Sequence, residues 1–371
     1  MSLPPAPTRA LLVIILLAGC SGASELLLPG DGEPARIVVF SGNEQIGRVG
    51  EALGDSVVFK VTDSQQRPLE GVQVAFELTA AGPGADVLPD TAETDAEGHA
   101  YTRVVLGTTI GTHVGQAWVV VPEETQAPST EFQVVALPEN ANEIVAQSGD
   151  NQSGSAGSTL PLPLVVQVRD AFGNPISGVS ITWTAEGGGN VSQPSSLTDS
   201  EGQASVQRTL GPTAGPQFTL VESPGLALVG SPVTFTHTAT AGNASGLSLI
   251  SGNGQTAQAG SRLPADLVVR LLDESGNGVP GAAVTWVVGA GGGSVTPENG
   301  TTDPAGYASA QWTLGPTPGP NRLDAVVSGV GVVNFSATGT VAPPAALSIL
   351  VQPASTAQNG RPLTRQPVIQ V

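Results

Sequence analysis

Hydrophobic and polar residues alternate with a period of two in many short stretches of the chain. Residues 72–76 and 179–183 show the pattern clearly, with Val, Ile, Phe or Trp at every second position. This period places alternate side chains on opposite faces of a β-strand, so that one face is buried. Gly, Pro, Asn and Asp bound the apolar runs, as they do between strands. The pattern predicts an all-β protein, without a helix of useful length after the first 20 residues.

Five sequence motifs recur three times in the same order, at intervals of about 104 residues. Such self-similarity is the signature of tandem structural units. The motifs are Ser-Gly-Asn/Asp-x-Gln from Ser41, Ser148 and Ser251; a strand ending at Asp63, Asp170 or Asp273; an alternating strand ending in the aromatic residue Phe76, Trp183 or Trp286; Asp-x-x-Gly-x-Ala from Asp95, Asp199 and Asp303; and Leu-Gly-x-Thr-x-Gly from Leu106, Leu210 and Leu314.

Each repeat is long enough for about seven short strands, with turn signals every 8–12 residues, which is typical of an immunoglobulin-like (Ig-like) β-sandwich. We therefore predict tandem Ig-like sandwiches, three complete and a fourth truncated. The predicted division is 1–19 signal peptide, 20–34 flexible tether, 35–138 repeat 1, 141–241 repeat 2, 245–342 repeat 3 and 345–371 an incomplete repeat 4. The last segment is expected to pack poorly and to form at most one or two strands.

The recurrent side chains have structural interpretations. The aromatic residue of each repeat, Phe76, Trp183 or Trp286, is expected in the core. The six recurrent carboxylates are expected to accept hydrogen bonds from backbone N–H groups of their own turns. Calcium binding is the alternative for these carboxylates, because calcium prefers several oxygen ligands. The Leu-Gly-x-Thr-x-Gly motif is interpreted as a conformational motif, with a contact between neighbouring repeats as the alternative.

The repeats resemble bacterial Ig-like domains of group 1, of the invasin and intimin type. The shared features are the Asp-ended strand, the Gly-Val-x-Val-x-Phe/Trp strand, and the Thr-Asp-x-x-Gly-x-Ala segments at 94–100, 198–204 and 302–308. The resemblance covers about residues 35–342. It implies surface-exposed modules that space or present an adhesive element.

The N-terminus predicts export and lipid anchoring. Residues 10–18 form an apolar run too short to span a bilayer as a helix but long enough for the core of a secretory signal. The run ends in Leu-Ala-Gly before Cys20, which resembles a bacterial lipobox. Cys20 is the only cysteine of the chain, and we expect it to carry the lipid that binds the protein to a membrane, with Ser21 favouring the outer membrane and a surface-exposed location.

Composition excludes several functions. The formal net charge is −18, which repels a nucleic-acid backbone, so no nucleic-acid partner is expected. With one cysteine, no disulfide can form within the chain, and each unit must be held together by its apolar core.

No constellation for catalysis, cofactor binding or metal binding is recognised. The three histidines, His99, His113 and His237, have no metal-ligand spacing, and no Gly-x-Ser-x-Gly nucleophile motif is present. His99 stands where the other repeats carry Gln203 and Tyr307, which predicts an exposed turn residue. The chain is therefore predicted not to be an enzyme, and no cofactor is expected.

The resulting hypothesis is a non-catalytic cell-surface lipoprotein whose tandem Ig-like domains form a stalk or adhesin-like spacer, with an unknown protein or polysaccharide ligand. The alternatives are a carbohydrate- or polymer-binding envelope module, and a non-catalytic subunit of an envelope complex. A polymer-binding module would need a planar patch of exposed aromatic residues. The chain has 4 Trp, 2 Tyr and 8 Phe, and most of them are expected in strand cores.

Overall fold

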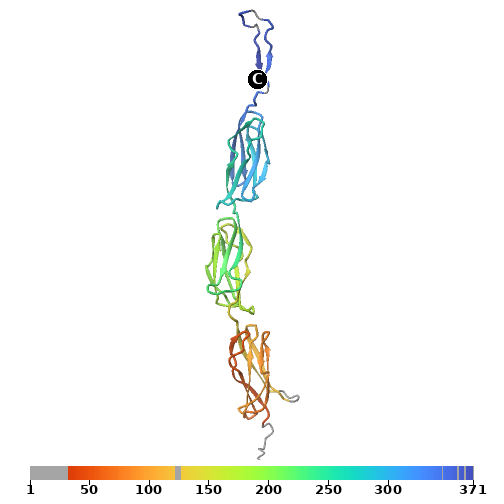
Figure 1. Ribbon diagram of the computed structural model, residues 1–371, viewed down its shortest axis with the longest axis vertical. Coiled ribbons are helices and arrows are strands. Elements are labelled where there is room, and N and C mark those ends of the chain that lie inside the picture. Colours follow the sequence, from red (N-terminus) through yellow and green to blue (C-terminus); the bar gives the residue numbers. More distant parts are fainter. Residues whose placement is uncertain (1–31, 122–126, 345, 357–358, 363–364, 371) are drawn as a thin grey trace, which may run out of the picture. The chain divides into compact units, whose positions relative to one another are not determined.

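The computed structural model describes residues 32–121, 127–344, 346–356, 359–362 and 365–370. The predicted signal peptide, Cys20 and most of the predicted tether lie outside these residues. The chain divides into two compact units, 1–139 and 140–371, which are described separately. Every regular element of the described residues is a β-strand, so the predicted all-β class is confirmed (Figure 1).

The first unit is a sandwich of two sheets, coloured red to orange in Figure 1. One sheet has the order β1-β3-β7-β5 and the other β2-β9-β8-β4-β6. The strands are β1 Arg36–Ser41, β2 Ile46–Arg48, β3 Val57–Thr62, β4 Gln73–Ala80, β5 Asp86–Leu88, β6 Thr91–Glu93, β7 His99–Val105, β8 Gly111–Val119 and β9 Ser129–Leu137. The first strand is divided between the sheets, since β1 pairs antiparallel with β3 whereas β2 pairs parallel with β9.

The second unit contains two further sets of sheets. Residues 143–240 form the sheets β10-β12-β16, β14-β17 and β11-β19-β18-β13-β15. The strands are β10 Glu143–Ser148, β11 Gln152–Ser155, β12 Leu164–Arg169, β13 Ser180–Glu186, β14 Gly189–Val191, β15 Ser195–Leu197, β16 Gln203–Val206, β17 Arg208–Leu210, β18 Gly215–Glu222 and β19 Val233–Thr240.

Residues 244–340 repeat the arrangement of the first unit, with sheets β20-β22-β26-β24 and β21-β28-β27-β23-β25. The strands are β20 Ala244–Ser251, β21 Gln255–Gln258, β22 Leu267–Asp273, β23 Ala283–Ala290, β24 Gly293–Thr296, β25 Asn299–Thr301, β26 Tyr307–Leu314, β27 Gly319–Val327 and β28 Gly331–Thr340. Each set has nine or ten strand segments rather than seven, because the first strand divides between sheets and short edge strands are added.

Each sandwich has its own buried core between its sheets. The period-two pattern accounts for these cores: along β22, buried and half-buried residues alternate without interruption. In the first core, Phe59 packs on Phe76 and Phe132 with ring centroids 5.2 and 5.5 Å apart. Trp183 packs on Phe235 at 6.4 Å and Trp286 on Phe335 at 5.9 Å. Equivalent positions therefore supply equivalent core contacts.

The described residues after 345 form only the antiparallel pair β29 Ser348–Val351 and β30 Val368–Gln370. Almost all side chains of these strands are exposed. The prediction of at most two poorly packed strands is confirmed for this part of the chain.

Candidate functional site

The carboxylate that ends the third strand of each repeat organises the turn that follows. Oδ1 of Asp170 accepts the backbone N–H groups of Phe172 and Asn174, at 2.9 and 2.8 Å. Asp63 and Asp273 bind the corresponding N–H groups two and four residues ahead in the same way. These bonds replace the strand pairing that ends at the turn.

The aspartate that begins each Asp-x-x-Gly-x-Ala motif organises a second turn, just before the strand that contains the alanine. Oδ1 of Asp95 accepts the backbone N–H groups of Glu97 and His99 at 3.0 and 2.8 Å. Asp199 and Asp303 make the equivalent pairs of bonds. The turns place a glycine at positive φ, and the backbone carbonyl of Val61 would lie 2.7 Å from a Cβ added to Gly98. Only glycine fits this position without displacing the backbone.

The threonine before each of these carboxylates has a role that the sequence motifs alone did not suggest. The buried hydroxyl of Thr198 donates to the carbonyl of Ile176 at 2.7 Å and accepts the N–H of Val179 at 2.9 Å. Thr94 and Thr302 do the same in the other sandwiches. The repeated Thr-Asp pair was the available signal. The threonine ties the start of the aromatic strand to the turn beside it.

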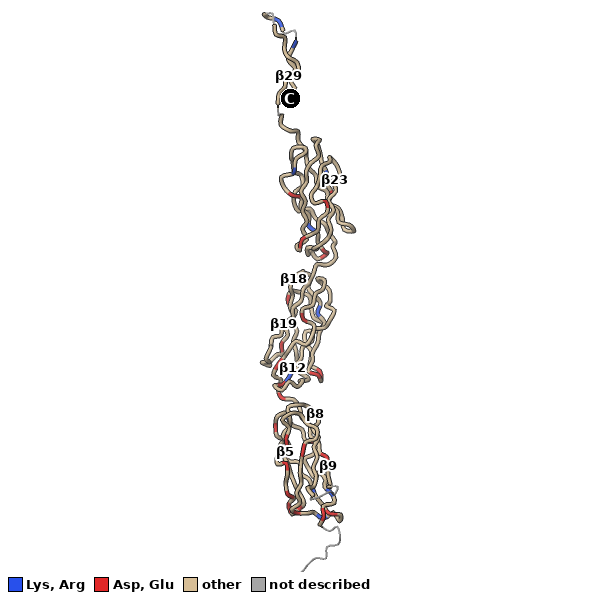
Figure 2. Tube along the Cα trace, turned by 90° about the vertical axis from the view of Figure 1, so that its right-hand side faces the viewer, with Lys and Arg blue, Asp and Glu red and all other residues tan. Residues whose placement is uncertain are grey.

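This arrangement favours turn formation over calcium binding for the six carboxylates. In all six, Oδ1 accepts two backbone N–H groups of the turn that follows, which is the bonding expected of a turn carboxylate. Among the described residues, no group of three or more His, Cys, Asp or Glu side chains could hold a metal ion. Figure 2 shows Asp and Glu distributed over all three sandwiches, with few Lys or Arg beside them.

The residue four positions after the strand-ending carboxylate differs between repeats. In the first repeat it is Arg67, whose guanidinium lies 2.7 Å from Oδ2 of Asp63. In the second and third it is an asparagine whose Nδ2 donates to the carboxylate, as Asn174 does to Asp170 at 2.9 Å. The side chain at this position therefore forms an ion pair with the aspartate in repeat 1 and an amide hydrogen bond with it in repeats 2 and 3.

Asn277 makes a contact between the second and third sandwiches. Its Nδ2 donates to the carbonyl of Pro212, and its Oδ1 accepts the N–H of Ala214, both at 2.8 Å. Pro212 and Ala214 belong to the Leu-Gly-x-Thr-x-Gly motif of repeat 2. We call these two bonds the Asn277 bridge. This copy of the motif therefore makes a contact between neighbouring repeats, which was the alternative interpretation of the motif.

Asp273 connects this bridge to the segment joining the two sandwiches. Its Oδ2 accepts Nδ2 of Asn277 at 2.9 Å and the N–H of Gly242 at 2.8 Å. Burial acts to raise the pKa of the Asp273 carboxyl, but hydrogen bonds from the Asn277 side chain and from the backbone of Gly242, Asn277 and Ser275 outweigh it, so this pKa lies below its ordinary value. One ionised side chain thus binds the turn and the connecting segment.

The three core aromatic residues are buried, but they differ in hydrogen bonding. Nε1 of Trp183 donates to Oγ of Ser196 at 2.9 Å. The indole N–H of Trp286 is buried and has no partner among the described residues. Ser196 lies opposite Ile181 across β13 and β15, and the matching position opposite Val284 is Gly300. Glycine therefore leaves the third repeat without the hydroxyl that the second supplies.

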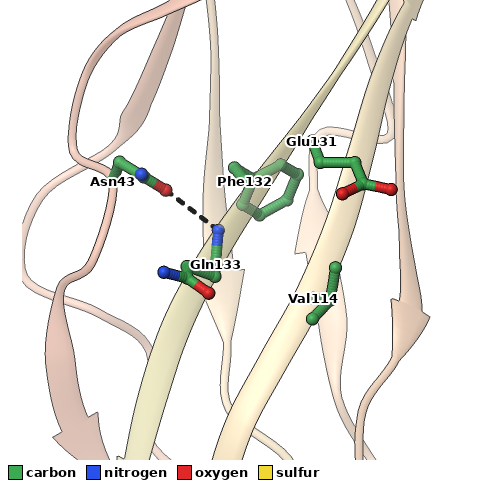
Figure 3. A pocket seen from close by; sticks show the side chains of 5 residues that line it. All are labelled: Asn43, Val114, Glu131, Phe132 and Gln133. Atoms are coloured by element: carbon green, nitrogen blue, oxygen red, sulfur yellow. Dashed lines mark hydrogen bonds between the residues drawn. The ribbon is translucent and has the colours of Figure 1, made fainter.

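A shallow pocket of about 280 Å³ lies on the first sandwich and is shown in Figure 3. Asn43, Val114, Glu131, Phe132 and Gln133 line it. Oδ1 of Asn43 accepts the N–H of Gln133 at 2.9 Å. Glu131 is the only charged side chain of the lining. The described lining offers neither a nucleophile with a base nor a carboxylate pair, and we assign no chemistry to it.

His99 does not lie as an exposed turn residue. Strand β7 begins at His99, and the ring of Phe40 packs on its imidazole with centroids 4.5 Å apart. The side chain of His99 is 21% exposed. The prediction was wrong because the cross-strand position of Phe40 could not be inferred from the turn motif alone.

Residues 144–211 match the family described as bacterial Ig-like domain (group 1). The group 1 resemblance inferred from the motifs is confirmed by this match. A search of curated protein sequences finds no match to the chain.

Solved structures of adhesins are similar to this chain. FdeC, an adhesin of Escherichia coli, is 20% identical with a TM-score of 0.53, and the similarity covers 84% of this chain and 99% of FdeC. Invasin, a bacterial integrin-binding protein, is 18% identical with a TM-score of 0.45, covering 85% of this chain and 62% of invasin. The FdeC similarity supports the tandem Ig-like sandwich fold.

No helix among the described residues is long and apolar enough to cross a membrane.

Proposed function

We propose that this chain is a non-catalytic, lipid-anchored protein of the cell envelope whose Ig-like repeats act as a stalk or adhesin-like spacer. The repeats are proposed at 35–138, 141–241 and 245–342, after a signal peptide (1–19) and a tether (20–34), with an incomplete repeat at 345–371. The lipid would be attached at Cys20. The observation that carries the proposal is the tandem series of sandwiches, each with a separate apolar core.

The packing of the sandwiches supports a mechanical role. Interiors of this kind resist deformation because their side chains are closely packed. The Asn277 bridge adds two hydrogen bonds across the boundary between repeats 2 and 3. A spacer needs both properties, since stiffness within units is useless if neighbouring units move freely.

Protease treatment of intact cells tests the location. We expect protease added outside the native organism to degrade the chain while a periplasmic marker protein remains whole. If the chain is spared in intact cells and degraded only after lysis, the surface role is wrong and the protein faces the periplasm. Cys20→Ser is the matched variant: it should lose incorporation of labelled fatty acid and appear in the soluble fraction. Equal fatty-acid labelling of both forms would contradict the anchor.

A polymer-binding module is the second candidate function. It is favoured by one observation, namely that Phe40 and Tyr101 are exposed on one face of the first sandwich. These two rings are exceptions, since most aromatic residues of the chain lie in the strand cores, as expected.

A further inference from the structure

The outer face of the sheet β1-β3-β7-β5 carries an unusual group of side chains. Phe40 is 58% exposed and Tyr101 57% exposed. Phe40 stands at the irregularity of β1 between Val39 and Ser41, and Tyr101 pairs with Val58 on β3. Large rings are costly to leave in water, so several on one face indicate a surface that binds something.

Two cations lie on the same face as these rings. Nζ of Lys60, the only lysine of the chain, lies 5.9 Å from the centroid of the Phe40 ring. Lys60 pairs with His99 across β3 and β7. On the other side of Tyr101, Arg103 is exposed and pairs with Leu88 of β5, which is 57% exposed. We call Phe40, Lys60, Tyr101, Arg103 and Leu88 the aromatic–basic face.

The equivalent face differs in the other repeats. In repeat 2 the positions of Phe40, Lys60 and Arg103 carry Gln147, Gln167 and Gln207, and Nε2 of Gln147 donates to Oε1 of Gln167 at 2.7 Å. In repeat 3, Arg270 stands at the position of Lys60 and lies 5.0 Å from the ring centroid of Tyr307, which stands at the position of His99, so this repeat keeps a cation beside a ring. The other two repeats lack Tyr101 and Arg103, which are replaced by serine and glutamine, so the fold itself does not require the complete aromatic–basic face.

The charge of the face contrasts with that of the chain. The whole chain has a formal net charge of −18, yet Lys60 and Arg103 project from adjacent strands here. Carboxylates near the face include Asp86, which is exposed on the same side of β5 as Leu88, and Asp95, whose Oδ1 lies 3.9 Å from Nδ1 of His99. Cations that are not paired with carboxylates can bind anionic groups of a ligand.

We propose that the aromatic–basic face binds an anionic polysaccharide, with sugar rings stacked on Phe40 and Tyr101 and acidic groups at Lys60 and Arg103. The Phe40 ring packs on His99 of β7, two residues before Tyr101 on the same strand, so both rings lie over this strand. Lys is depleted in protein–protein interfaces, whereas rings with cations beside them suit a ligand that has both C–H faces and carboxylates. The proposal does not depend on the lipid anchor or on the spacer role.

The test uses the full-length chain in detergent and titration calorimetry with alginate as the anionic probe and dextran as the neutral one. We expect alginate to bind, with an affinity that falls as salt is added, and dextran not to bind. Phe40→Ala/Tyr101→Ala should weaken alginate binding at least tenfold, and Lys60→Gln should weaken it several-fold and flatten the salt dependence. Phe172→Ala is the matched control, because Phe172 is also an exposed aromatic residue but lies in a turn of repeat 2.

The outcomes separate the possible occupants. Unchanged binding by the double variant would overturn the proposal, as would equal binding of dextran and alginate or no binding of alginate. Light scattering of the wild-type chain gives a further check. Self-association that the double variant loses would assign the face to a second copy of the chain instead. The melting temperature of the double variant should match that of the wild type, because both rings are exposed.

Discussion

Asn277 accepts the backbone N–H of Ala214 through its side-chain oxygen at 2.8 Å, across the boundary between two Ig-like sandwiches. The same amide donates to Pro212 and to Asp273, so its donors and its acceptor are all used. An asparagine in a turn therefore has a second role that depends on the preceding repeat. The residue at the same position of repeat 1 is Arg67, which instead forms an ion pair with its own turn.

Asn277→Ala should loosen the boundary between repeats 2 and 3. The variant removes both bonds of the Asn277 bridge and one bond to Asp273, and we expect the free energy of unfolding to fall by about 1–2 kcal/mol. Amide hydrogen exchange at Ala214 should become faster. Asn253→Ala is the matched control, because Oδ1 of Asn253 accepts the N–H of Ser336 within repeat 3. The control should accelerate amide exchange at Ser336 and leave exchange at Ala214 unchanged. If exchange at Ala214 is equally fast in the wild type and in Asn277→Ala, the Asn277 bridge is refuted.

The stability of the same region should decrease in acid. The folded-state pKa of Asp273 lies below its ordinary value, so its ionised form stabilises the fold. This contribution is complete above the unfolded-state pKa of about 3.9 and is lost as the pH falls through the lower folded-state pKa. Denaturant unfolding between pH 6 and pH 2.5 measures it.

Asp273→Asn provides the comparison for this pH dependence. The variant should be less stable at pH 6 and should show a weaker decline in acid. Asp63 and Asp324, whose pKa values are also lowered, should cause the decline that remains. If the variant and the wild type decline in parallel, Asp273 does not contribute.

The alternation of residues and the recurring motifs were enough to predict the sandwich class and the placement of Trp183 and Trp286 in the sheets, because burial of one strand face leaves a direct period in the sequence. The Asn277 bridge was not predictable in detail. Its partners are 63 and 65 residues away, and only the folded chain brings them together. The exposure of Phe40 was also missed, because Phe40 stands at a register irregularity of β1, between Val39 and Ser41, that the alternation of residues does not reveal.

Gly300→Ser should stabilise the third repeat. The buried indole N–H of Trp286 has no partner among the described residues, whereas the equivalent Trp183 donates to Ser196. A Cβ on Gly300 would meet only the Pro297 side chain, at an ordinary 3.6 Å. A hydroxyl at this position is expected to add about 0.5–1.5 kcal/mol to the free energy of unfolding. Thermal unfolding followed by tryptophan fluorescence measures the change.

Ser196→Ala is the reciprocal variant for this hydrogen bond. It should destabilise the second repeat by about 1 kcal/mol or more, because it leaves the Trp183 N–H without its acceptor. Gly300→Ala separates the effect of the hydroxyl from that of the added Cβ. If Gly300→Ala stabilises the chain as much as Gly300→Ser does, the gain comes from the backbone rather than from the hydrogen bond to Trp286.

Arg208→Ala should be among the more damaging single changes in repeat 2. The guanidinium is completely buried, and its Nη2 donates to the carbonyls of Gly188 and Glu186 at 2.8 and 3.2 Å. Burial lowers the pKa of Arg208 because it disfavours the charged form of the guanidinium. The hydrogen bonds to these carbonyl oxygens offset that cost. Alanine would leave a cavity and unpartnered carbonyls, and we expect a loss of about 2–3 kcal/mol in denaturant unfolding.

The other repeats and an exposed arginine provide the controls for Arg208. Val104 and Trp312 stand at the same position in repeats 1 and 3, and both are buried and apolar. The fold therefore accepts an uncharged side chain at this position where the neighbouring residues pack against it. Arg270→Ala, which removes a guanidinium from the outside of a sheet, should cost less than about 1 kcal/mol. Hydrogen exchange of residues 187–189 should accelerate only in Arg208→Ala, because the arginine binds the carbonyl oxygens of that loop; unchanged exchange there would show that the guanidinium does not order it.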